Sequence, residues 1–481
     1  MDPLISGYVL FRKPWLVTAL LMLLALLLYL PVCRAEYLYT DEAVQLWHYR
    51  PGSAYHMFIE QGRYLTDRLV SFLFSHTDSI SGLRYVRLFS LLAWMACVPV
   101  WYMVLRYICH REQIHPSAPF LVTAWLVCSP ACTISIAWAS CVELSFAYTA
   151  GLLAGYCFYR YQCDRHTGGI TALLLSFSVL AGLVSLFSYQ NGIGCFFLPF
   201  VIRVLGGRAP MAKNFSVLLF AGFIALLYFL LFRWQLHYFG ISAGNRTSIV
   251  SNPLKKLAFF FARPFVAAWL PGVGYNESDR RVFLYVIPVI LLVFYLSCRY
   301  ILPGQSLRKK TASMLLLLLF CLASYYPSLL VKENYASVRT TLALSLVTLT
   351  WLIVLLSRSV AKKPVLHFAG MLLLVLLFAG NGLYNFHIRF LRPHVAEHLE
   401  AVASFRQGYD AGTNSFSWQR PAESDFEIRY GITRSWDEFG VPSLFFPWVP
   451  EFYFKQLLYE QTGDREKASS LHVTTTPPLQ P

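Results

Sequence analysis

The chain has 481 residues, of which 57% are hydrophobic and only 14% are charged, whereas a soluble globular domain carries about 25% charged residues. Its mean hydropathy of +0.51 excludes an ordinary soluble enzyme as the class of the whole chain. The formal net charge of +15 suggests a nucleic-acid partner at first sight, but the basic residues are spread over alternate loops and form no single basic surface. We therefore expect no nucleic acid among the partners.

Apolar stretches long enough to cross a bilayer recur along the chain. Uncharged, mainly apolar runs of about 18 residues or more are typical of membrane-spanning helices. Such runs occupy residues 16–32, 88–105, 119–141, 170–189, 215–232, 282–297, 311–331, 340–357 and 365–386. Two shorter stretches, 144–159 and 192–202, are needed to keep the topology consistent, which gives about eleven spans in total. We therefore predict an all-α polytopic membrane protein.

Clusters of Lys and Arg follow every second predicted span, as the positive-inside rule requires of cytoplasmic loops. The residues include Arg12, Lys13, Arg106, Arg111, Arg160, Arg165, Arg203, Arg208, Arg299, Lys309, Arg358 and Lys362. They indicate a cytoplasmic N-terminus. Loops 34–87 and 237–281 and the tail after residue 386 are then expected on the outer side of the membrane.

The chain divides into a membrane part and a polar tail. Residues 1–386 form the predicted transmembrane domain, and residues 387–468, which mix charges with aromatic side chains, are predicted to form a small C-terminal domain outside the membrane. The final stretch, 469–481, is rich in Ser, Thr and Pro and is expected to be disordered. In the outer loops, the spacing of apolar residues predicts interfacial helices at 64–73 and 257–261.

An acid pair, Asp41-Glu42, lies in the first outer loop a few residues after the first predicted span. A carboxylate here can take a proton from an acceptor hydroxyl as a general base, although acids in outer loops are most often simply solvated. If the pair opens a helix, the two side chains point about 100° apart, so only one of them can face a cavity. Tyr39 and Trp47 lie nearby and are candidates for stacking on sugar rings.

Glu143 is the most unusual acid, because it stands in an apolar stretch near the outer end of a predicted span. An ionisable residue at membrane depth is costly and suggests a functional role by default. The alternative is a glutamate whose charge is satisfied by a structural partner.

Basic residues on the outer side run against the positive-inside pattern and therefore need another reason. Arg84 and Arg87 stand at the entrance to the second span, and Lys332 and Arg339 stand in the short loop before the span at 340–357. Arginine binds phosphate through two parallel hydrogen bonds and lysine binds it as a point charge. All four are candidates for binding a phosphate group, with Arg339 the first choice. A rival basic cluster, for which lipid headgroups are the expected ligands, consists of Lys255, Lys256 and Arg263.

Several segments in order carry a family resemblance. They are the outer-loop acid with its amphipathic helix, then LRYVRLFSLLAW, SCVELSFAYTAGLLAGYCFYRY and GLVSLFSYQNGIGCFFLPFVIRVL. Together they resemble the GT-C glycosyltransferases, membrane enzymes that use polyprenyl-phosphate-linked sugars. The likeness covers roughly residues 1–210. Within this superfamily, DEA…GRYLTDRL and SYQNGIGCFFLP look nearest to the serotype-converting glucosyltransferases of bacteria and phage.

The resemblance implies a GT-C-like fold and an inverting glycosyltransferase. Such an enzyme moves a sugar from a polyprenyl-phosphate or dolichyl-phosphate donor to a glycan or lipid acceptor on the outer face, as in modification of a lipopolysaccharide O-antigen. It implies that Asp41, or else Glu42, is the general base, that Glu143 positions the acceptor, and that Tyr189 and Gln190 contact the acceptor or the sugar. Some members bind a divalent metal at the acid, so a Mg²⁺ or Mn²⁺ cofactor is left open.

The implied setting is the bacterial inner membrane, with the C-terminus in the periplasm. The expected partners are membrane lipids, the lipid-linked sugar donor, an envelope glycan or lipid acceptor, a glycosyltransferase that makes the donor and a flippase that delivers it.

Two other classes stay open as alternatives. A transporter or flippase of lipid-linked saccharides would more often show broken helices in repeated halves, and no repeat is visible in the sequence. An outer-leaflet polysaccharide polymerase or ligase typically depends on arginines in a late outer loop and not on an early acid.

Overall fold

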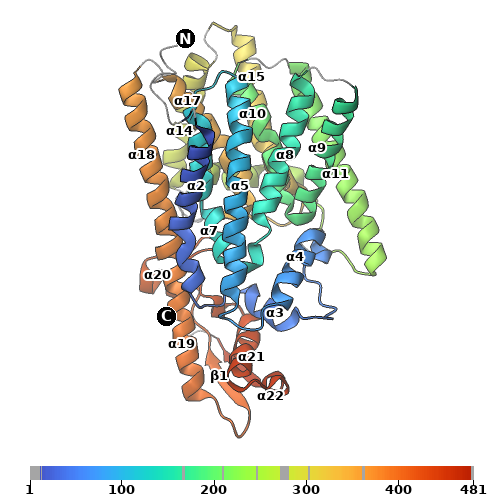
Figure 1. The fold of residues 1–481 in the computed structure, drawn as a ribbon, viewed down its shortest axis with the longest axis vertical. Helices are drawn as coiled ribbons and strands as arrows, with labels where there is room; N and C mark the ends of the chain where they lie inside the picture. The colour runs from blue at the N-terminus through green and yellow to red at the C-terminus, as the bar shows by residue number, and fades with distance from the viewer. Residues whose placement is uncertain are drawn as a thin grey trace.

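The computed structural model describes residues 11, 13–164, 168–207, 211–244, 247–270, 281–301, 304–359 and 363–477. Over these residues, long helices form a bundle, and the C-terminal segment extends from one end of it (Figure 1). The short helices α3 (Asp41–His48) and α4 (Tyr64–Ser75) of the first loop lie at the same end. The predicted helical fold is confirmed for the bundle, and the C-terminal segment adds a 2-stranded sheet.

The long helices follow the predicted apolar runs. They are α2 (Pro14–Tyr29), α5 (Leu83–Arg111), α8 (Leu144–Cys163), α9 (Gly168–Ser188), α11 (Met211–Phe239), α14 (Val282–Tyr300), α15 (Leu307–Ser324), α17 (Val338–Ser359) and α18 (Pro364–Leu383). Shorter pieces are α6 (Ser117–Cys128), α7 (Pro130–Ala137), the 3-10 helix η5 (Gln190–Phe197), α10 (Leu198–Leu205), α12 (Pro253–Ala262), α13 (Pro264–Ala268) and α16 (Tyr326–Leu330).

The number of spans is lower than the about eleven predicted. In the described part of the chain, 8 helical stretches are long and apolar enough to cross a membrane, or 9 if the bent pair α6–α7 counts as one. The stretch Gln190–Leu205 falls short of that length. Helix α15 is helical as expected, but it begins with Arg308, Lys309 and Lys310, so its apolar part is too short for the roughly 20 residues that a span needs.

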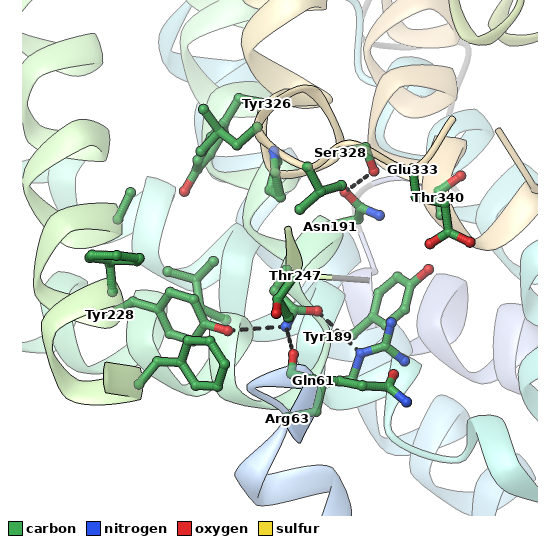
Figure 2. Close-up of a pocket in the computed structure, with 18 of the residues that line it drawn as sticks. Gln61, Arg63, Tyr189, Asn191, Tyr228, Thr247, Tyr326, Ser328, Glu333 and Thr340 are labelled. Atoms are coloured by element: carbon green, nitrogen blue, oxygen red, sulfur yellow. Dashed lines mark hydrogen bonds between the residues drawn. The ribbon is translucent and has the colours of Figure 1, made fainter. Parts of the chain in front are cut away.

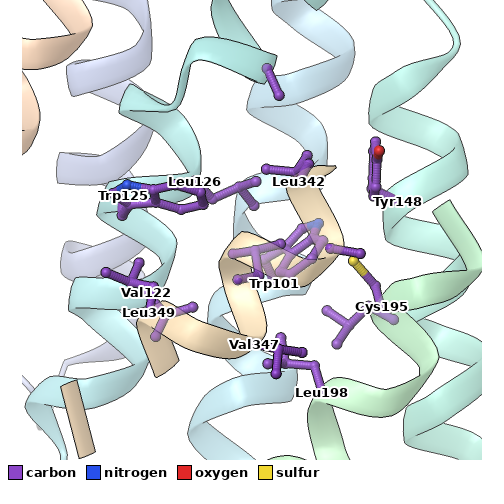
Figure 3. Close-up of a cluster of buried hydrophobic side chains, with 14 of the residues drawn as sticks. Trp101, Val122, Trp125, Leu126, Tyr148, Cys195, Leu198, Leu342, Val347 and Leu349 are labelled. Atoms are coloured by element: carbon purple, nitrogen blue, oxygen red, sulfur yellow. The ribbon is translucent and has the colours of Figure 1, made fainter. Parts of the chain in front are cut away.

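Helix α17 forms the centre of the bundle. In its most apolar window 89% of the residues are buried, against 22% in α9 and α11 and 17% in α14. Leu342, Val347 and Leu349 of α17 belong to one buried cluster with Trp101 of α5 and Leu126 of α6 (Figure 3). The outer helices keep apolar side chains on the surface, which a lipid environment tolerates and water does not.

Helix α8 approaches η5 closely through two glycines. A Cβ atom on Gly155 would meet the carbonyl carbon of Phe196 at 2.8 Å, and one on Gly151 would meet that of Gly192 at 2.9 Å. Both distances are shorter than packed atoms allow, and neither backbone can move alone. This contact holds η5 against the bundle at the point where the chain turns back from α9.

We expect Gly155→Ala to lower the free energy of unfolding by about 1–3 kcal/mol, because the added methyl group overpacks a backbone contact. Gly380→Ala is the matched control, since a Cβ atom there meets nothing within 4 Å. Unfolding of the two variants in lipid nanodiscs measures the difference. Equal stability of both variants would contradict the close packing of α8 on η5.

The C-terminal segment continues directly from α18 (Figure 1). A π-helical stretch, Tyr384–Leu391, joins α18 to α19 (Arg392–Gly408). The elements that follow are β1 (Ser415–Gln419), α20 (Asp425–Tyr430), α21 (Val449–Thr462), α22 (Arg465–Ser469) and β2 (His472–Thr476).

The expected disorder of 469–481 is wrong for the part of this stretch that the structure describes. Strand β2 pairs in parallel with β1, with Ser415 opposite His472. Leu471 is only 4% exposed and packs in the apolar core of the C-terminal segment. The polar composition misled the prediction because β1 supplies the backbone partners that a lone polar tail lacks. Residues 478–481 lie outside the described residues.

The C-terminal segment packs on the first loop, residues 34–87. Arg465 Nη2 donates to the Trp47 carbonyl oxygen at 2.6 Å, and the Arg465 guanidinium lies 3.9 Å from the centre of the Trp47 ring. Gln456 Nε2 donates to the Asp78 carbonyl oxygen at 2.8 Å. The first loop and the tail therefore form one layer, which we call the outer layer, over one end of the bundle.

Candidate functional site

A cavity of about 290 Å³ lies between the first loop and the ends of several bundle helices (Figure 2). Part of its wall is apolar and aromatic, and the rest carries charged and amide side chains. The residues that matter for its chemistry are Arg63, Tyr189, Gln190, Asn191, Tyr228, Phe229, Phe232, Tyr326, Glu333, Tyr335 and Arg339. We call this space the bundle cavity.

Two loop segments close one side of the bundle cavity. Ile249, which follows α11, forms an antiparallel bridge with Val331, which follows α16. Lys332 N donates to the Ser248 carbonyl oxygen at 2.7 Å on one side of this bridge. Because α16 ends at Leu330, the residues after it can be extended and pair with the segment that follows α11. The bridge fixes the roof of the cavity through backbone hydrogen bonds.

Arg63 stands immediately before α4 and lines the bundle cavity. Its Nε donates to Gln190 Oε1 at 3.2 Å, and its guanidinium lies 4.6 Å from the centre of the Tyr189 ring. Gln190 is itself fixed, because its Nε2 donates to the Gln61 carbonyl oxygen at 2.7 Å and to Tyr228 Oη at 3.0 Å. Among the described residues no hydrogen bond is made by the two terminal nitrogens of Arg63, so this cation can receive an anion.

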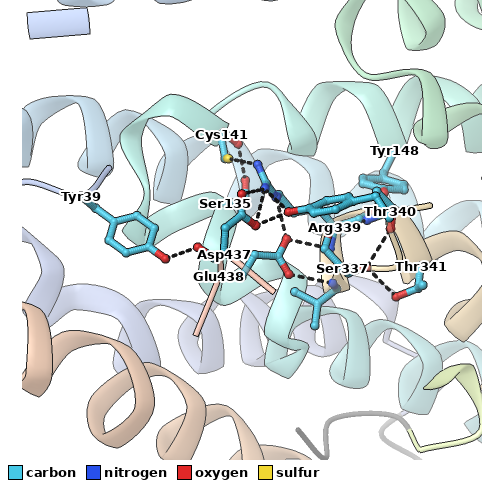
Figure 4. Close-up of polar contacts among 12 residues, drawn as sticks. Tyr39, Ser135, Cys141, Tyr148, Ser337, Arg339, Thr340, Thr341, Asp437 and Glu438 are labelled. Atoms are coloured by element: carbon cyan, nitrogen blue, oxygen red, sulfur yellow. Dashed lines mark hydrogen bonds and ion pairs between the residues drawn. The ribbon is translucent and has the colours of Figure 1, made fainter. Parts of the chain in front are cut away.

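Arg339 lines the same cavity and is held by acids of the C-terminal segment (Figure 4). Its Nε donates to Glu438 Oε1 at 2.6 Å, and its Nη2 donates to Asp437 Oδ1 at 3.3 Å and to Tyr335 Oη at 3.1 Å. The guanidinium also lies 4.3 Å from the centre of the Trp138 ring. Acidic residues of the C-terminal segment thus balance the charge of Arg339, which we predicted from the sequence to bind a phosphate group.

Glu438 is the anchor of this contact. It is fully buried, and it accepts from Val338 N at 2.7 Å as well as from Arg339. Burial raises the pKa of the Glu438 carboxyl, while the Arg339 guanidinium opposes the rise. Since Val338 begins α17, the carboxylate also satisfies an otherwise unpaired N–H at a helix N-terminus.

Glu143 lies immediately before α8, with 2% of its surface exposed. Its Oε2 is buried and has no hydrogen-bond partner among the described residues. It interacts electrostatically with both Arg63 and Arg339. A buried carboxylate oxygen without a partner is rare and needs an explanation. Glu143 itself does not line the bundle cavity, although the two arginines with which it interacts do.

The side chains of Asp41 and Glu42 have different surroundings, as expected for two neighbouring residues at the start of a helix. Glu42 is fully buried, with Arg87 Nη2 at 2.6 Å and the backbone N–H groups of Tyr39 and Ala139 donating at 2.8 and 2.6 Å. Asp41 is half-buried at the start of α3 and does not line the bundle cavity. Glu42 and Arg87, both candidates for the site, therefore form a closed structural pair in this structure.

The other predicted residues lie at several places in the structure. Tyr189 and Gln190 line the bundle cavity, as Arg339 does. Trp47 has its ring covered by Arg465. The hydroxyl of Tyr39 donates to the Asp437 carbonyl oxygen, with the ring among Trp138, Phe390 and His394. Arg84 donates to its neighbour Tyr85 at 3.1 Å, and Lys332 is exposed beside the cavity roof.

The rival basic cluster is partly engaged in the fold. Lys256 is 4% exposed, and its Nζ donates to the Glu333 carbonyl oxygen at 2.5 Å and to Asn334 Oδ1 at 3.0 Å. Burial lowers the pKa of Lys256 to about 8. The helix predicted at 257–261 is confirmed as part of α12, and its position relative to a bilayer stays a prediction.

Sequence reasoning missed three residues of the site. Arg63 was not named as a candidate, although an arginine directly before the predicted interfacial helix at 64–73 was an available signal. Asp437 and Glu438 gave none, since they reach Arg339 across about a hundred residues of chain. The part of the chain that the structure describes holds no cluster of three or more His, Cys, Asp or Glu side chains able to bind a metal, and we derive no step through a metal ion.

The bundle cavity therefore combines a fixed, accessible cation, a second cation balanced by the tail, and a nearby buried carboxylate. Its apolar wall belongs to helices that expose apolar side chains. No protein-family model matches this chain, and a comparison with curated proteins finds no match.

Proposed function

We propose that the protein transfers a sugar from a polyprenyl-phosphate donor to a hydroxyl of an envelope glycan or lipid, with inversion at the anomeric carbon. The observation that carries this proposal is that one cavity joins a lipid-facing apolar wall to the cations Arg63 and Arg339. A lipid-linked sugar phosphate has both an apolar chain and an anionic head. The resemblance of residues 1–210 to the GT-C glycosyltransferases supports the same reaction.

The apolar wall suits an isoprenoid chain. Helix α11 contributes Ala225, Tyr228, Phe229 and Phe232 to the bundle cavity. Phe229 is also 45% exposed on the outer surface of the bundle, so the wall is continuous with the surface that lipid would cover. A donor could therefore enter sideways from the bilayer and leave its chain against α11.

The charged end suits the phosphate. Arg63 offers its terminal nitrogens from a guanidinium that Gln190 and Tyr189 hold in place. A preorganised guanidinium favours the doubly charged phosphate that forms when the sugar leaves. Arg339 adds positive charge from the other side, and its acids Asp437 and Glu438 limit how strongly it binds.

The reaction is a single displacement. The acceptor hydroxyl gives its proton to a carboxylate, for which Glu143 is our candidate, and its oxygen forms a bond to the anomeric carbon. The bond from that carbon to the phosphate oxygen breaks, and its electron pair stays on the polyprenyl phosphate. Proton, bond and leaving group balance without a further reactant.

The test uses the full chain in lipid nanodiscs with a panel of polyprenyl-phosphate sugars and envelope glycan as acceptor. We expect wild-type protein to convert donor into polyprenyl phosphate and Arg63→Gln to raise KM for the donor about tenfold or more, since a hydrogen bond to a charged group contributes roughly 1.5–3 kcal/mol. Arg68→Gln is the matched control: it removes the same charge from an exposed position of α4.

Two results would contradict the proposal. One is a wild-type protein that consumes no donor but moves lipid-linked sugar across the bilayer, which would favour the flippase. The other is an equal effect of Arg63→Gln and Arg68→Gln, which would mean that general surface charge, and not the bundle cavity, attracts the donor.

A further inference from the structure

A second cavity lies entirely within the C-terminal segment. It has a volume of about 320 Å³, which is in the range of small-molecule sites of about 300–1,000 Å³. Its walls come from α19, the end of β1 and α20, and they include Glu397, Trp418, Arg420, Asp425 and Tyr430. It shares no lining residue with the bundle cavity.

Two hydrogen-bond donors in this wall lack partners. Trp418 Nε1 and Arg420 Nε are both buried without a hydrogen bond among the described residues. Arg420 is held in place because its Nη1 donates to the Phe445 carbonyl oxygen at 3.2 Å. Trp418 is held by Phe454, whose ring centre lies 5.1 Å away. Buried donors are almost always satisfied, so two of them in one wall indicate a ligand that offers oxygen acceptors.

The same wall presents fixed acceptors. Asp425 Oδ1 lies 3.0 Å from Arg429 Nε, and the same guanidinium binds Glu400 Oε2 at 2.7 Å. Glu397 accepts from the N–H groups of Ser443 at 3.0 Å and Leu444 at 2.8 Å. Arg429 therefore holds Asp425 and Glu400, and both oxygens of Glu397 already accept hydrogen bonds, so the three carboxylates are fixed in position.

Charge and shape limit the class of ligand. The lining holds the carboxylates Glu397, Glu400 and Asp425 against the guanidinium groups Arg420 and Arg429, so an anionic ligand is disfavoured. Trp418, Phe426 and Tyr430 add aromatic surface. A pyranose ring matches this wall, because it has an apolar face that packs on aromatic rings and hydroxyl groups that both donate and accept.

We propose that the C-terminal cavity is a binding site for a neutral saccharide. If the proposed transferase function holds, this ligand is a sugar unit of the acceptor glycan, bound away from the point of transfer; the identification of the ligand as acceptor rests on that function. The saccharide site itself rests only on the lining of the C-terminal cavity.

The test is direct binding by saturation-transfer NMR, with full-length protein in nanodiscs free of sugar-based detergent. The probes are the methyl glycosides of glucose, galactose and N-acetylglucosamine, for which dissociation constants of the order of 1 mM are typical of a single weakly held unit. We expect Trp418→Ala to weaken binding about threefold to tenfold through loss of the aromatic surface and Asp425→Asn to weaken it as well. Ile428→Ala is the control, since Ile428 lies on α20 as Asp425 does, is 72% exposed and is not part of the cavity wall.

The outcomes separate this site from the bundle cavity. Binding that is weakened in Trp418→Ala and Asp425→Asn but unchanged in Ile428→Ala and Arg63→Gln supports the proposal, whether or not wild-type protein turns over a donor. Binding of no probe, or binding unchanged in folded Trp418→Ala and Asp425→Asn, overturns it. Displacement of the sugars by inorganic phosphate also overturns it, because it would show an anion site.

Discussion

Replacing Glu143 with Gln is expected to lower the rate of sugar transfer about a hundredfold or more, which is the usual contribution of a positioned general base. The amide keeps the size of the side chain but cannot take the acceptor proton. The carboxylate is a candidate for this role because its Oε2 has no partner among the described residues and because it interacts with Arg63 and Arg339, which line the bundle cavity. The measurement is kcat for transfer at saturating donor in nanodiscs.

Asp41→Asn is the comparison, because Asp41 is the other candidate base; it stands half-buried in the first loop and, like Glu143, does not line the bundle cavity. We expect less than about a tenfold loss of kcat, below the range of a general base. If Asp41→Asn abolishes transfer and Glu143→Gln does not, the base is Asp41, as the family resemblance implies. If Glu143→Gln changes only KM for the donor, Glu143 acts on the arginines and not on the acceptor.

The helices of the bundle could be predicted from sequence because each is coded locally. An apolar run such as 365–386 or 282–297 predicts a long apolar helix whatever its neighbours are, and α18 and α14 confirm a helix at both places. Spans fail where the local signal is broken, as at Gln190–Leu205, which is short and begins as a 3-10 helix. What such a stretch packs against decides its structure, and that is not local.

The site was only partly predictable for the same reason. Tyr189 and Gln190 were named through the family resemblance, and Arg339 was named because a basic residue on the outer side runs against the positive-inside pattern; all three line the bundle cavity. The pairing of Arg339 with Glu438 could not be found, since the two are 99 residues apart. A sequence shows that a charged residue stands in an unusual place, but it does not show which residue is its ion-pair partner.

The acid pair Asp41-Glu42 shows most clearly that a sequence does not reveal the partners of a charged residue. Both acids of Asp41-Glu42 were read as candidates for chemistry, and helix geometry correctly required that they point apart. The structure gives Glu42 three hydrogen-bonding partners and leaves it no exposed surface. Arg87, read as a phosphate ligand, is its ion-pair partner. Glu42 and Arg87 each look functional when considered alone, but their ion pair explains why both charges are present.

We therefore expect Arg87→Met to lower the free energy of unfolding by about 3–5 kcal/mol, because removing one partner of a buried pair leaves the other charge unpaired. Both side chains are 0% exposed, and Arg87 also donates to the carbonyl oxygens of Tyr37 and Ala137 at 2.9 and 3.1 Å. The loss should appear in denaturant unfolding in nanodiscs.

The control is Arg434→Met, because Arg434 pairs with Glu423 at 2.6 Å with 50% and 42% of the two side chains exposed, and an exposed pair contributes about 0–1 kcal/mol. The double change Glu42→Gln with Arg87→Met should recover part of the loss, since no buried charge is then left alone. If Arg87→Met instead leaves stability unchanged and raises KM for the donor, Arg87 binds phosphate in a state more open than this one. A stability loss without a change in KM would show that Arg87 and Glu42 form a structural ion pair that holds the first loop against the bundle. Arg63 and Arg339 would then be the two cations of the bundle cavity that bind phosphate.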